Sequence, residues 1–132
     1  MSVLLSCLLI TVVMPMLAKL PLIVAMHRAG GYDNRHPRAQ QASLTGFGAR
    51  AKACHENCFE AITLFTPGVL ALLALNAVSD TSATLAIIFV VARLCYCLCY
   101  WIDQDKLRSL AWVVGFACSL ALLIQAINHV TL

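Results

Sequence analysis

Charged residues are scarce in this chain. Only 11% of its 132 residues are Asp, Glu, Lys or Arg, whereas a typical soluble domain has about 25%. Apolar residues make up 61%, which is more apolar surface than a soluble chain of this length can bury in one core. The composition therefore excludes an ordinary soluble domain. A lipid bilayer removes the difficulty, because a membrane-spanning helix needs ~20 predominantly apolar residues.

Four apolar runs are long enough to cross a bilayer. Together with their connectors they use nearly the whole sequence, which leaves no room for a soluble domain. We therefore predict one domain over residues 1–132, an all-α membrane protein built as a four-transmembrane-helix bundle. The predicted spans lie at about residues 3–26, 51–78, 83–101 and 108–130.

Basic residues are absent from both ends of the chain and from the connector at 79–82, and this asymmetry predicts an orientation. The loop at 27–50 carries several arginines, and the last connector carries Lys106 and Arg108. The positive-inside rule places such loops in the cytoplasm, so both termini are expected on the periplasmic side. The net charge of +3 sits in loops rather than on a stripe with interleaved aromatics. We therefore expect no nucleic-acid partner.

No Cys-x-x-Cys spacing occurs among the seven cysteines. A zinc or redox site therefore has little support from the sequence, and we expect no metal site. On a helix, Cys95 and Cys99 share one face while Cys97 points away from it. We interpret the cysteines as small apolar residues that pack between helices.

Ionisable residues inside membrane spans are costly, so each is a functional-site hypothesis. In the second span, Asn57 and Glu60 fall on one helical stripe. Arg93 heads a second stripe in the third span, followed by Tyr96 and Tyr100. Because two polar stripes in lipid are expected to face each other, we predict that Arg93 pairs with Glu60, with Asn57 hydrogen-bonded nearby. At 1.5 Å per residue, both stripes belong to the half of the bilayer next to the basic loops.

The N-terminus of the fourth span is expected to be suited to binding an anion. Asp105 can cap it, and Arg108 and Ser109 then occupy its first turns. Free backbone N–H groups and a positive helix dipole suit an anion there, and Arg108 adds a donor fork for a carboxylate. A purely structural alternative stays open, in which the Arg93–Glu60 pair only locks two helices together.

Two motifs resemble those of a known family. Arg50 followed by His55-x-Asn57-x-x-Glu60 resembles the Arg…His-x-Asn-x-x-Glu motif of the MAPEG family, the membrane-associated proteins of eicosanoid and glutathione metabolism. The third-span stripe and the Arg108–Ser109 pair resemble that family's second motif. The loop at 30–39 is similar to that of short bacterial members. The likeness covers nearly the whole chain, in the right order and spacing.

The resemblance implies a four-helix protomer that assembles as a homotrimer in a bacterial inner membrane. It further implies that glutathione, as a co-substrate, binds between neighbouring protomers near the cytoplasmic face. Arg108 matches the position that stabilises the thiolate in relatives, and Ser109 is a competing candidate for thiol activation. The remaining positions that match the glutathione-contacting motif are Arg50, Asn57, Glu60, Arg93, Tyr96 and Tyr100.

Physical chemistry agrees with that implication. Glutathione carries two carboxylates and one ammonium group, so its site needs several cations and at least one carboxylate. Arg50, Arg93 and Arg108, with Glu60, supply that balance. A nearby positive charge or helix N-terminus also lowers the pKa of a thiol from ~8.5.

The chain departs from the family pattern at three positions. Ala53 and Glu56 stand where eicosanoid-synthesising members commonly have arginines, and Trp112 stands where a Tyr is frequent. The sequence therefore favours a detoxifying, glutathione-dependent transferase or peroxidase that acts on lipophilic electrophiles from the bilayer. The alternatives are a non-catalytic member of the family and a small transporter. The latter has little support because the first span contains no acidic residue.

Overall fold

The computed structural model describes residues 1–131, which form five helices and, within that range, no strand. All except the short α2 are long and apolar enough to cross a membrane. This confirms the predicted all-α membrane fold with four spanning helices. The helices are α1 (Ser2–Arg28), α2 (Pro37–Ser43), α3 (Gly46–Ala74), α4 (Asp80–Trp101) and α5 (Asp105–Thr131).

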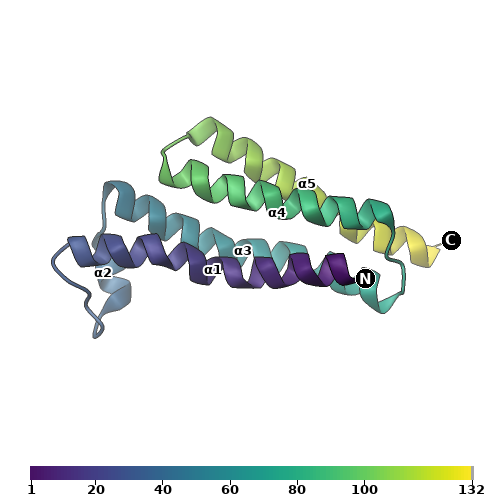
Figure 1. Ribbon diagram of the computed structural model, residues 1–132, viewed down its shortest axis with the longest axis horizontal. Helices are drawn as coiled ribbons and strands as arrows, with labels where there is room; N and C mark the ends of the chain where they lie inside the picture. The colour runs from purple at the N-terminus through teal and green to yellow at the C-terminus, as the bar shows by residue number, and fades with distance from the viewer. Residues whose placement is uncertain (132) are drawn as a thin grey trace.

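The helices pack as two antiparallel pairs. The most extensive contacts join α1 with α3 and α4 with α5, and α3 also packs against α5. The N-terminus, the C-terminal part of α5 and the α3–α4 connector lie at one end of the bundle (Figure 1), which we call the termini end. The short α2 and the α4–α5 connector lie at the other end, the loop end. This arrangement agrees with basic loops on one side; which side is cytoplasmic stays a prediction.

The helix that contains the second predicted span ends at Ala74, before the predicted limit of residue 78. Asn76 adopts a left-handed backbone conformation with a φ of 52°. Its N–H donates to the Leu73 carbonyl at 3.2 Å, and the Ala77 N–H donates to the Leu72 carbonyl at 2.9 Å. These two bonds form a Schellman motif, which satisfies the last carbonyls and stops the helix.

Helix α4 has a defined start and a matching stop. Ser79 and Ser82 exchange side-chain to backbone hydrogen bonds in a capping box at its N-terminus, which satisfies two otherwise free N–H groups. Asp103 ends the helix with a φ of 64°, and the Gln104 N–H donates to the Cys99 carbonyl at 2.8 Å. This second Schellman motif fixes the tight connector from α4 to α5.

The half of the bundle near the termini end has a close-packed apolar core. Phe65 of α3 and Phe89 of α4 stack with ring centroids 4.0 Å apart and an interplanar angle of 6°. At Gly68, an added Cβ would lie 2.9 Å from the Leu122 Cβ and 3.0 Å from the Leu123 backbone nitrogen. The absence of a side chain at Gly68 thus lets α3 and α5 approach closely.

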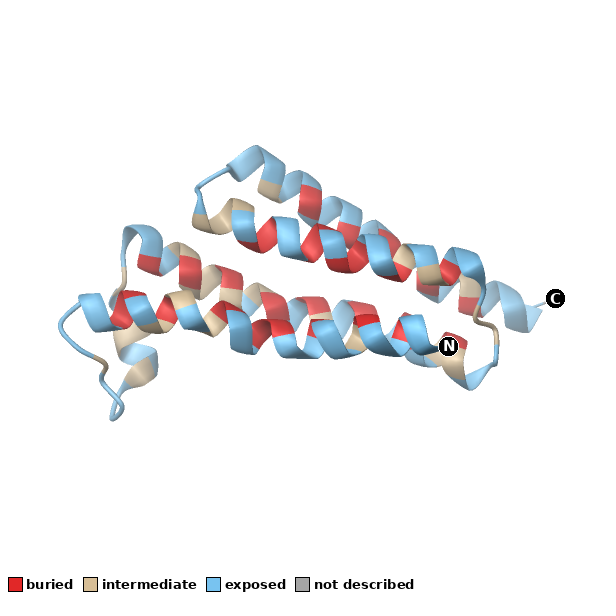
Figure 2. Cartoon of the chain, in the orientation of Figure 1, coloured by how far each residue is buried: buried red, intermediate tan, exposed pale blue. Residues whose placement is uncertain are grey.

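The outward faces of the spanning helices are exposed and largely apolar. Figure 2 shows the buried residues as inward-facing stripes, with exposed residues along the outer sides of all four helices. Large aliphatic side chains such as Leu9, Leu20 and Leu110 lie on those outer sides. An exposed apolar surface of this extent suits contact with lipid or with another membrane-embedded chain.

Candidate functional site

Arg93 is the central residue of the loop-end half. It lies on α4 with only 3% of its surface exposed. Gly115 of α5 lies beside it; a Cβ there would lie 3.4 Å from the Arg93 Cδ, which is an ordinary contact distance. Within residues 1–131, no carboxylate reaches ion-pair distance of this guanidinium, and its Nε has no hydrogen-bond partner. A buried, permanently charged group is therefore only partly compensated.

Asn57 of α3 accepts the hydrogen bonds that the Arg93 guanidinium does make. The Arg93 Nη2 donates to the Asn57 Oδ1 at 2.6 Å and to the Asn57 backbone carbonyl at 3.3 Å. The Asn57 Nδ2 in turn donates to the Glu60 Oε2. The predicted direct pairing of Arg93 with Glu60 is therefore wrong. Asn57 lies between them and links the buried cation to the exposed carboxylate.

Two tyrosine rings lie between two arginine side chains on the way from Arg93 to the loop end. The Arg93 Cζ lies 4.2 Å from the Tyr96 ring centroid, and the rings of Tyr96 and Tyr100 meet edge to face at 5.3 Å. The Arg108 Cζ lies 4.4 Å from the Tyr100 ring centroid. Ring faces attract cations, so the tyrosines hold both guanidinium groups in place. The α4 stripe predicted from the sequence and Arg108 of α5 thus form one continuous arrangement.

A polar cleft of about 270 Å³ opens beside this arrangement. A smaller cavity of about 10 Å³, lined in part by Arg93 and Glu60, adjoins it through Asn57 and Trp112. Seven of the eight candidate residues from the sequence therefore lie at one connected site. The lining of the polar cleft is Asn57, Tyr96, Tyr100, Arg108, Ser109, Trp112 and Val113.

Trp112 contributes to both cavities, yet the sequence marked it only as a departure from the family pattern. Its position one helical turn after Arg108 was the available signal, because residues four apart share a helix face. Trp112 also stacks on Phe116 with ring centroids 5.3 Å apart. It forms an aromatic wall of the polar cleft.

The N-terminal turn of α5 presents Arg108 and Ser109 to the cleft. The helix begins at Asp105 itself, so Asp105 lies in the first turn and not before it; its carboxylate accepts from the Lys106 N–H at 2.8 Å. The Ser109 hydroxyl donates to the Asp105 carbonyl at 3.0 Å. Because that proton is engaged within the helix, Arg108 is the better-placed donor to a thiolate.

Arg50 is the one candidate that lines neither the polar cleft nor the adjoining cavity. Its Nη1 lies 3.3 Å from the Asp103 Oδ2, where the left-handed conformation of Asp103 directs the carboxylate. This ion pair ties α3 to the α4–α5 connector. Arg50 therefore contributes to the framework around the site in the isolated chain.

Two neighbours of the α3 stripe have other partners. The carboxylate of Glu56 lies 2.8 Å from the Lys52 Nζ. His55 faces α1, where its Nδ1 lies 2.9 Å from the Pro15 carbonyl oxygen; a carbonyl only accepts, so Nδ1 carries the proton. His55 therefore lies on the α1-facing side of α3 and is not part of the stripe of Asn57 and Glu60.

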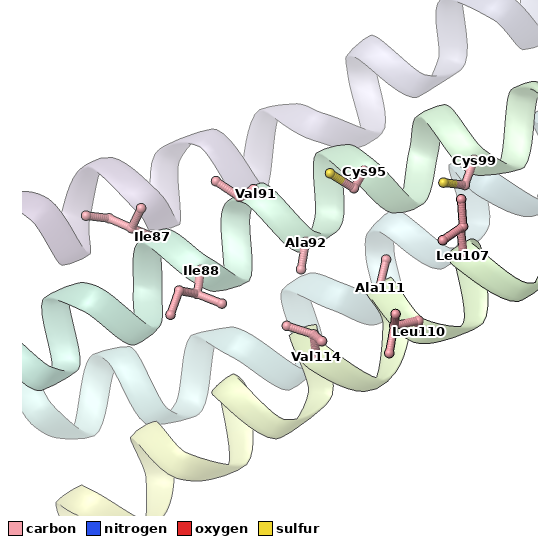
Figure 3. A pocket seen from close by; sticks show the side chains of 10 residues that line it. All are labelled: Ile87, Ile88, Val91, Ala92, Cys95, Cys99, Leu107, Leu110, Ala111 and Val114. Atoms are coloured by element: carbon pink, nitrogen blue, oxygen red, sulfur yellow. The ribbon is translucent and has the colours of Figure 1, made fainter.

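An apolar groove of about 480 Å³ runs between α4 and α5 on a different face from the Arg93 stripe. Figure 3 shows Cys95 and Cys99 on α4 beside Leu107, Leu110 and Ala111 of α5. The predicted shared face of Cys95 and Cys99 is confirmed. The groove had no sequence signal of its own, because its lining consists of aliphatic and cysteine side chains like those along the rest of the spanning helices.

Comparison with known proteins gives one match. The model of the MAPEG family matches residues 3–128, a range that includes every candidate residue and confirms the resemblance seen in the motifs. No curated protein and no solved structure shows a significant match to the chain.

Proposed function

The chain belongs to the MAPEG family, and we propose that it binds glutathione in the polar cleft and uses the thiolate against lipophilic electrophiles. One observation carries this proposal: the guanidinium of Arg93 is buried without a carboxylate partner among the described residues. A buried charge without its counter-ion is strongly unfavourable. A site with such an unpaired, buried cation is suited to binding an anionic ligand.

The charges around the cleft match those of glutathione. Arg93 and Arg108 lie at opposite ends of the tyrosine pair. Arg108 lines the cleft and can receive a carboxylate or the thiolate, whereas Arg93 lines the adjoining cavity and attracts the anion through its charge and through Asn57. Glu60 is exposed at the edge of the adjoining cavity and suits the ammonium group. Asn57, already shared between Arg93 and Glu60, would orient the peptide between them.

Arg108 is the residue that we assign to thiolate stabilisation. It is half-buried in the first turns of α5, where the helix dipole adds to its charge. Both effects favour loss of the thiol proton to solvent. The sulfur lone pair then forms a bond to the electrophilic carbon of the second substrate as the leaving group departs. The same thiolate can reduce a peroxide, so transferase and peroxidase assays are both needed.

The size of the cleft favours completion by a second chain. Its volume of about 270 Å³ is at the lower limit of ligand pockets, which are typically about 300–1,000 Å³. We therefore propose a homotrimer in which a neighbouring protomer covers the polar cleft. The lipophilic substrate would arrive through the bilayer, with the loop end in the cytoplasm and the termini in the periplasm of a bacterial inner membrane.

A non-catalytic role is the second candidate, and specific contacts favour it. Glu56 adds a negative charge that is tied to Lys52, and Arg50 is engaged by Asp103. Both features reduce the positive charge available to a peptide with two carboxylates. A protein of this kind would bind glutathione weakly or hold another anionic ligand without turnover.

The Arg108→Ala variant tests the proposal. We expect calorimetry to detect glutathione binding to the parent protein, and expect Arg108→Ala to lose the thiolate absorbance and most transferase and peroxidase turnover. Lys106→Ala is the matched control, because Lys106 is exposed on the same turn and does not line the cleft.

Two results would overturn the assignment. The first is no binding up to ~10 mM glutathione, which corresponds to an affinity weaker than roughly −3 kcal/mol. The second is unchanged turnover in Arg108→Ala. Binding without turnover in the parent protein would support the non-catalytic candidate.

A further inference from the structure

Three buried thiols meet between α3 and α4, apart from the polar cleft. Cys54 and Cys58 lie one turn apart on α3, and Cys97 lies opposite them on α4. All three sulfur atoms are within 4.8 Å of one another, and the Sγ atoms of Cys58 and Cys97 are 3.7 Å apart. Their exposed fractions are 0%, 1% and 5%, respectively. We call this group the thiol triad.

The fold creates the triad from an arrangement that sequence spacing does not reveal. Residues four apart on α3 place Cys54 and Cys58 on one face, whereas Cys97 comes from another helix. Met14 and Ala18 of α1 pack against the same cluster and close it from the third side. The triad is thus a defined, enclosed set of soft ligands, with the guanidinium of Arg93 nearby, bonded to the backbone of Asn57 next to Cys58.

We propose that the thiol triad binds trivalent arsenic as a neutral tris-thiolate complex. With the central atom about 2.3 Å from each sulfur, the usual length of a zinc–thiolate bond, three sulfurs lie about 4.0 Å apart around a planar centre. They lie somewhat closer around trivalent arsenic, whose lone pair makes its three bonds pyramidal. The observed separations of 3.7 Å for one pair and at most 4.8 Å for all pairs fit that geometry with small side-chain rotations. Thiolates also select soft, thiophilic centres over hard cations.

Coordination number and charge decide between the thiophilic candidates. Zn²⁺ in a closed structural site takes four ligands, whereas the triad offers three. Three thiolates around Cu⁺ leave a net charge of −2, of which the nearby guanidinium of Arg93 offsets at most one, and the remainder is costly inside a membrane span. Arsenous acid reacts as As(OH)₃ + 3 Cys–SH → As(S–Cys)₃ + 3 H₂O. Three As–O bonds break, three As–S bonds form, each thiol proton leaves in water, and arsenic stays trivalent. Reactants and product are all uncharged, so the reaction creates no buried charge.

The burial of the triad points to the same ligand. Thiols with almost no exposed surface are reached only by a small ligand during local opening of the helices, and a neutral one loses little hydration on the way. This inference does not depend on glutathione binding. The sequence led us to expect no metal site, because no Cys-x-x-Cys spacing occurs along the chain. A site assembled from two helices does not require that spacing.

Arsenite titration of the reduced, detergent-purified protein tests the proposal. Cys95 and Cys99 form a separate pair on the apolar groove (Figure 3), so the experiment uses a Cys95→Ser/Cys99→Ser background. We expect one arsenic per chain by elemental analysis, a sulfur-to-arsenic charge-transfer band, and X-ray absorption showing three sulfur neighbours and no oxygen.

Single replacements then locate the site. Cys97→Ala should weaken arsenite binding by at least about tenfold, because the third bond otherwise forms at a high effective concentration. Cys118→Ala is the matched control, since Cys118 is also buried but packs in the core near the termini end; it should leave binding unchanged. The X-ray absorption of the background protein needs no triad variant, so it tests the coordination even if Cys97→Ala fails to fold.

Three results would overturn the inference. One is an arsenic shell with two sulfurs and one oxygen in the background protein. Another is unchanged affinity in a folded Cys97→Ala variant. The third is displacement of bound arsenic by an equal concentration of Zn²⁺, which would contradict the argument that a site of three thiols disfavours Zn²⁺.

Discussion

The two halves of the bundle are built differently. Near the termini end, α3 meets α4 through the stacked rings of Phe65 and Phe89, and α3 meets α5 at Gly68 with almost no gap. Towards the loop end, the same helices enclose a buried arginine, a polar cleft and three thiols. The interior of one half is close-packed and apolar, whereas the other half holds a buried charge, a polar cleft and a cluster of thiols.

This difference shows how a small membrane protein can support a polar site. Lipid is as apolar as the helix surfaces, so close packing rather than hydrophobic transfer holds spanning helices together. The termini half supplies that packing and fixes the helices relative to one another. The loop half can then accommodate groups such as Arg93, whose burial is unfavourable for the free energy of folding.

Arg93→Leu should give the largest effect and should separate binding from stability. We expect glutathione affinity to fall about a hundredfold, equal to about 2.8 kcal/mol, because the variant loses the buried cation. We expect the free energy of unfolding to stay equal or to rise, since replacing an incompletely paired buried charge with an apolar side chain is often stabilising. Calorimetry and denaturation in mixed micelles measure the two quantities.

The exposed Arg38 of α2 provides the control for that experiment. Arg38→Leu removes the same charge far from the cleft and should change neither quantity appreciably. If Arg93→Leu binds glutathione normally but unfolds more easily, Arg93 is a structural residue and the contrast between the halves fails.

Phe65→Ala should produce the opposite pattern. It removes one partner of the stack with Phe89 in the close-packed half, and Phe65 does not line the cavity beside Arg93. In lipid the transfer part of the usual large-to-small penalty largely vanishes, so the cavity part of roughly 2 kcal/mol remains. We expect a loss of unfolding free energy of that size in mixed micelles, with glutathione affinity of the folded protein changed less than threefold, or about 0.6 kcal/mol. A large affinity loss in protein that is still folded would show that the two halves are coupled.

The same substitution at two glycines compares the halves directly. At Gly68, an added Cβ would lie 2.9 Å from the Leu122 Cβ and 3.0 Å from a backbone nitrogen, so Gly68→Ala forces α3 and α5 apart at about 1–3 kcal/mol. At Gly115, the nearest atom would be the Arg93 Cδ at 3.4 Å, which is ordinary contact. Gly115→Ala should stabilise α5 by up to about 1 kcal/mol through helix propensity. Equal effects at both sites in thermal unfolding would contradict the proposed difference in packing.

The sequence predicted the fold well because lipid imposes simple rules on length and polarity. It also predicted the α4 stripe of Arg93, Tyr96 and Tyr100, since helical periodicity fixes which residues share a face. The end of α3 was misplaced because apolar residues continue past Ala74, while the stop depends on the left-handed conformation of Asn76.

Contacts between helices were harder to predict. Helical angles place Asn57 and Glu60 on one stripe but do not say which side chain reaches Arg93, and the hydrogen bonds show that it is Asn57. The pairing of Arg50 with Asp103 likewise depends on how a connector folds. The assembly of the site thus depends on side-chain length and loop geometry, which periodicity does not encode.

The smallest effect is expected outside both halves, in the loop before α2. Backbone N–H groups of His36 and then Arg35 donate to the Asp33 carboxylate and hold the pKa of this exposed group below its ordinary value. A lowered pKa means that the ionised carboxylate stabilises the folded turn above the ordinary pKa of about 3.9. That contribution is lost as the pH falls through the lowered value. The protection of these two N–H groups, measured as their exchange rate relative to the intrinsic rate at each pH, should therefore fall at acidic pH in the parent protein. Asp33→Asn keeps an acceptor oxygen but does not titrate, so its exchange should lack that acid transition; a transition that persists would assign the titration to another group.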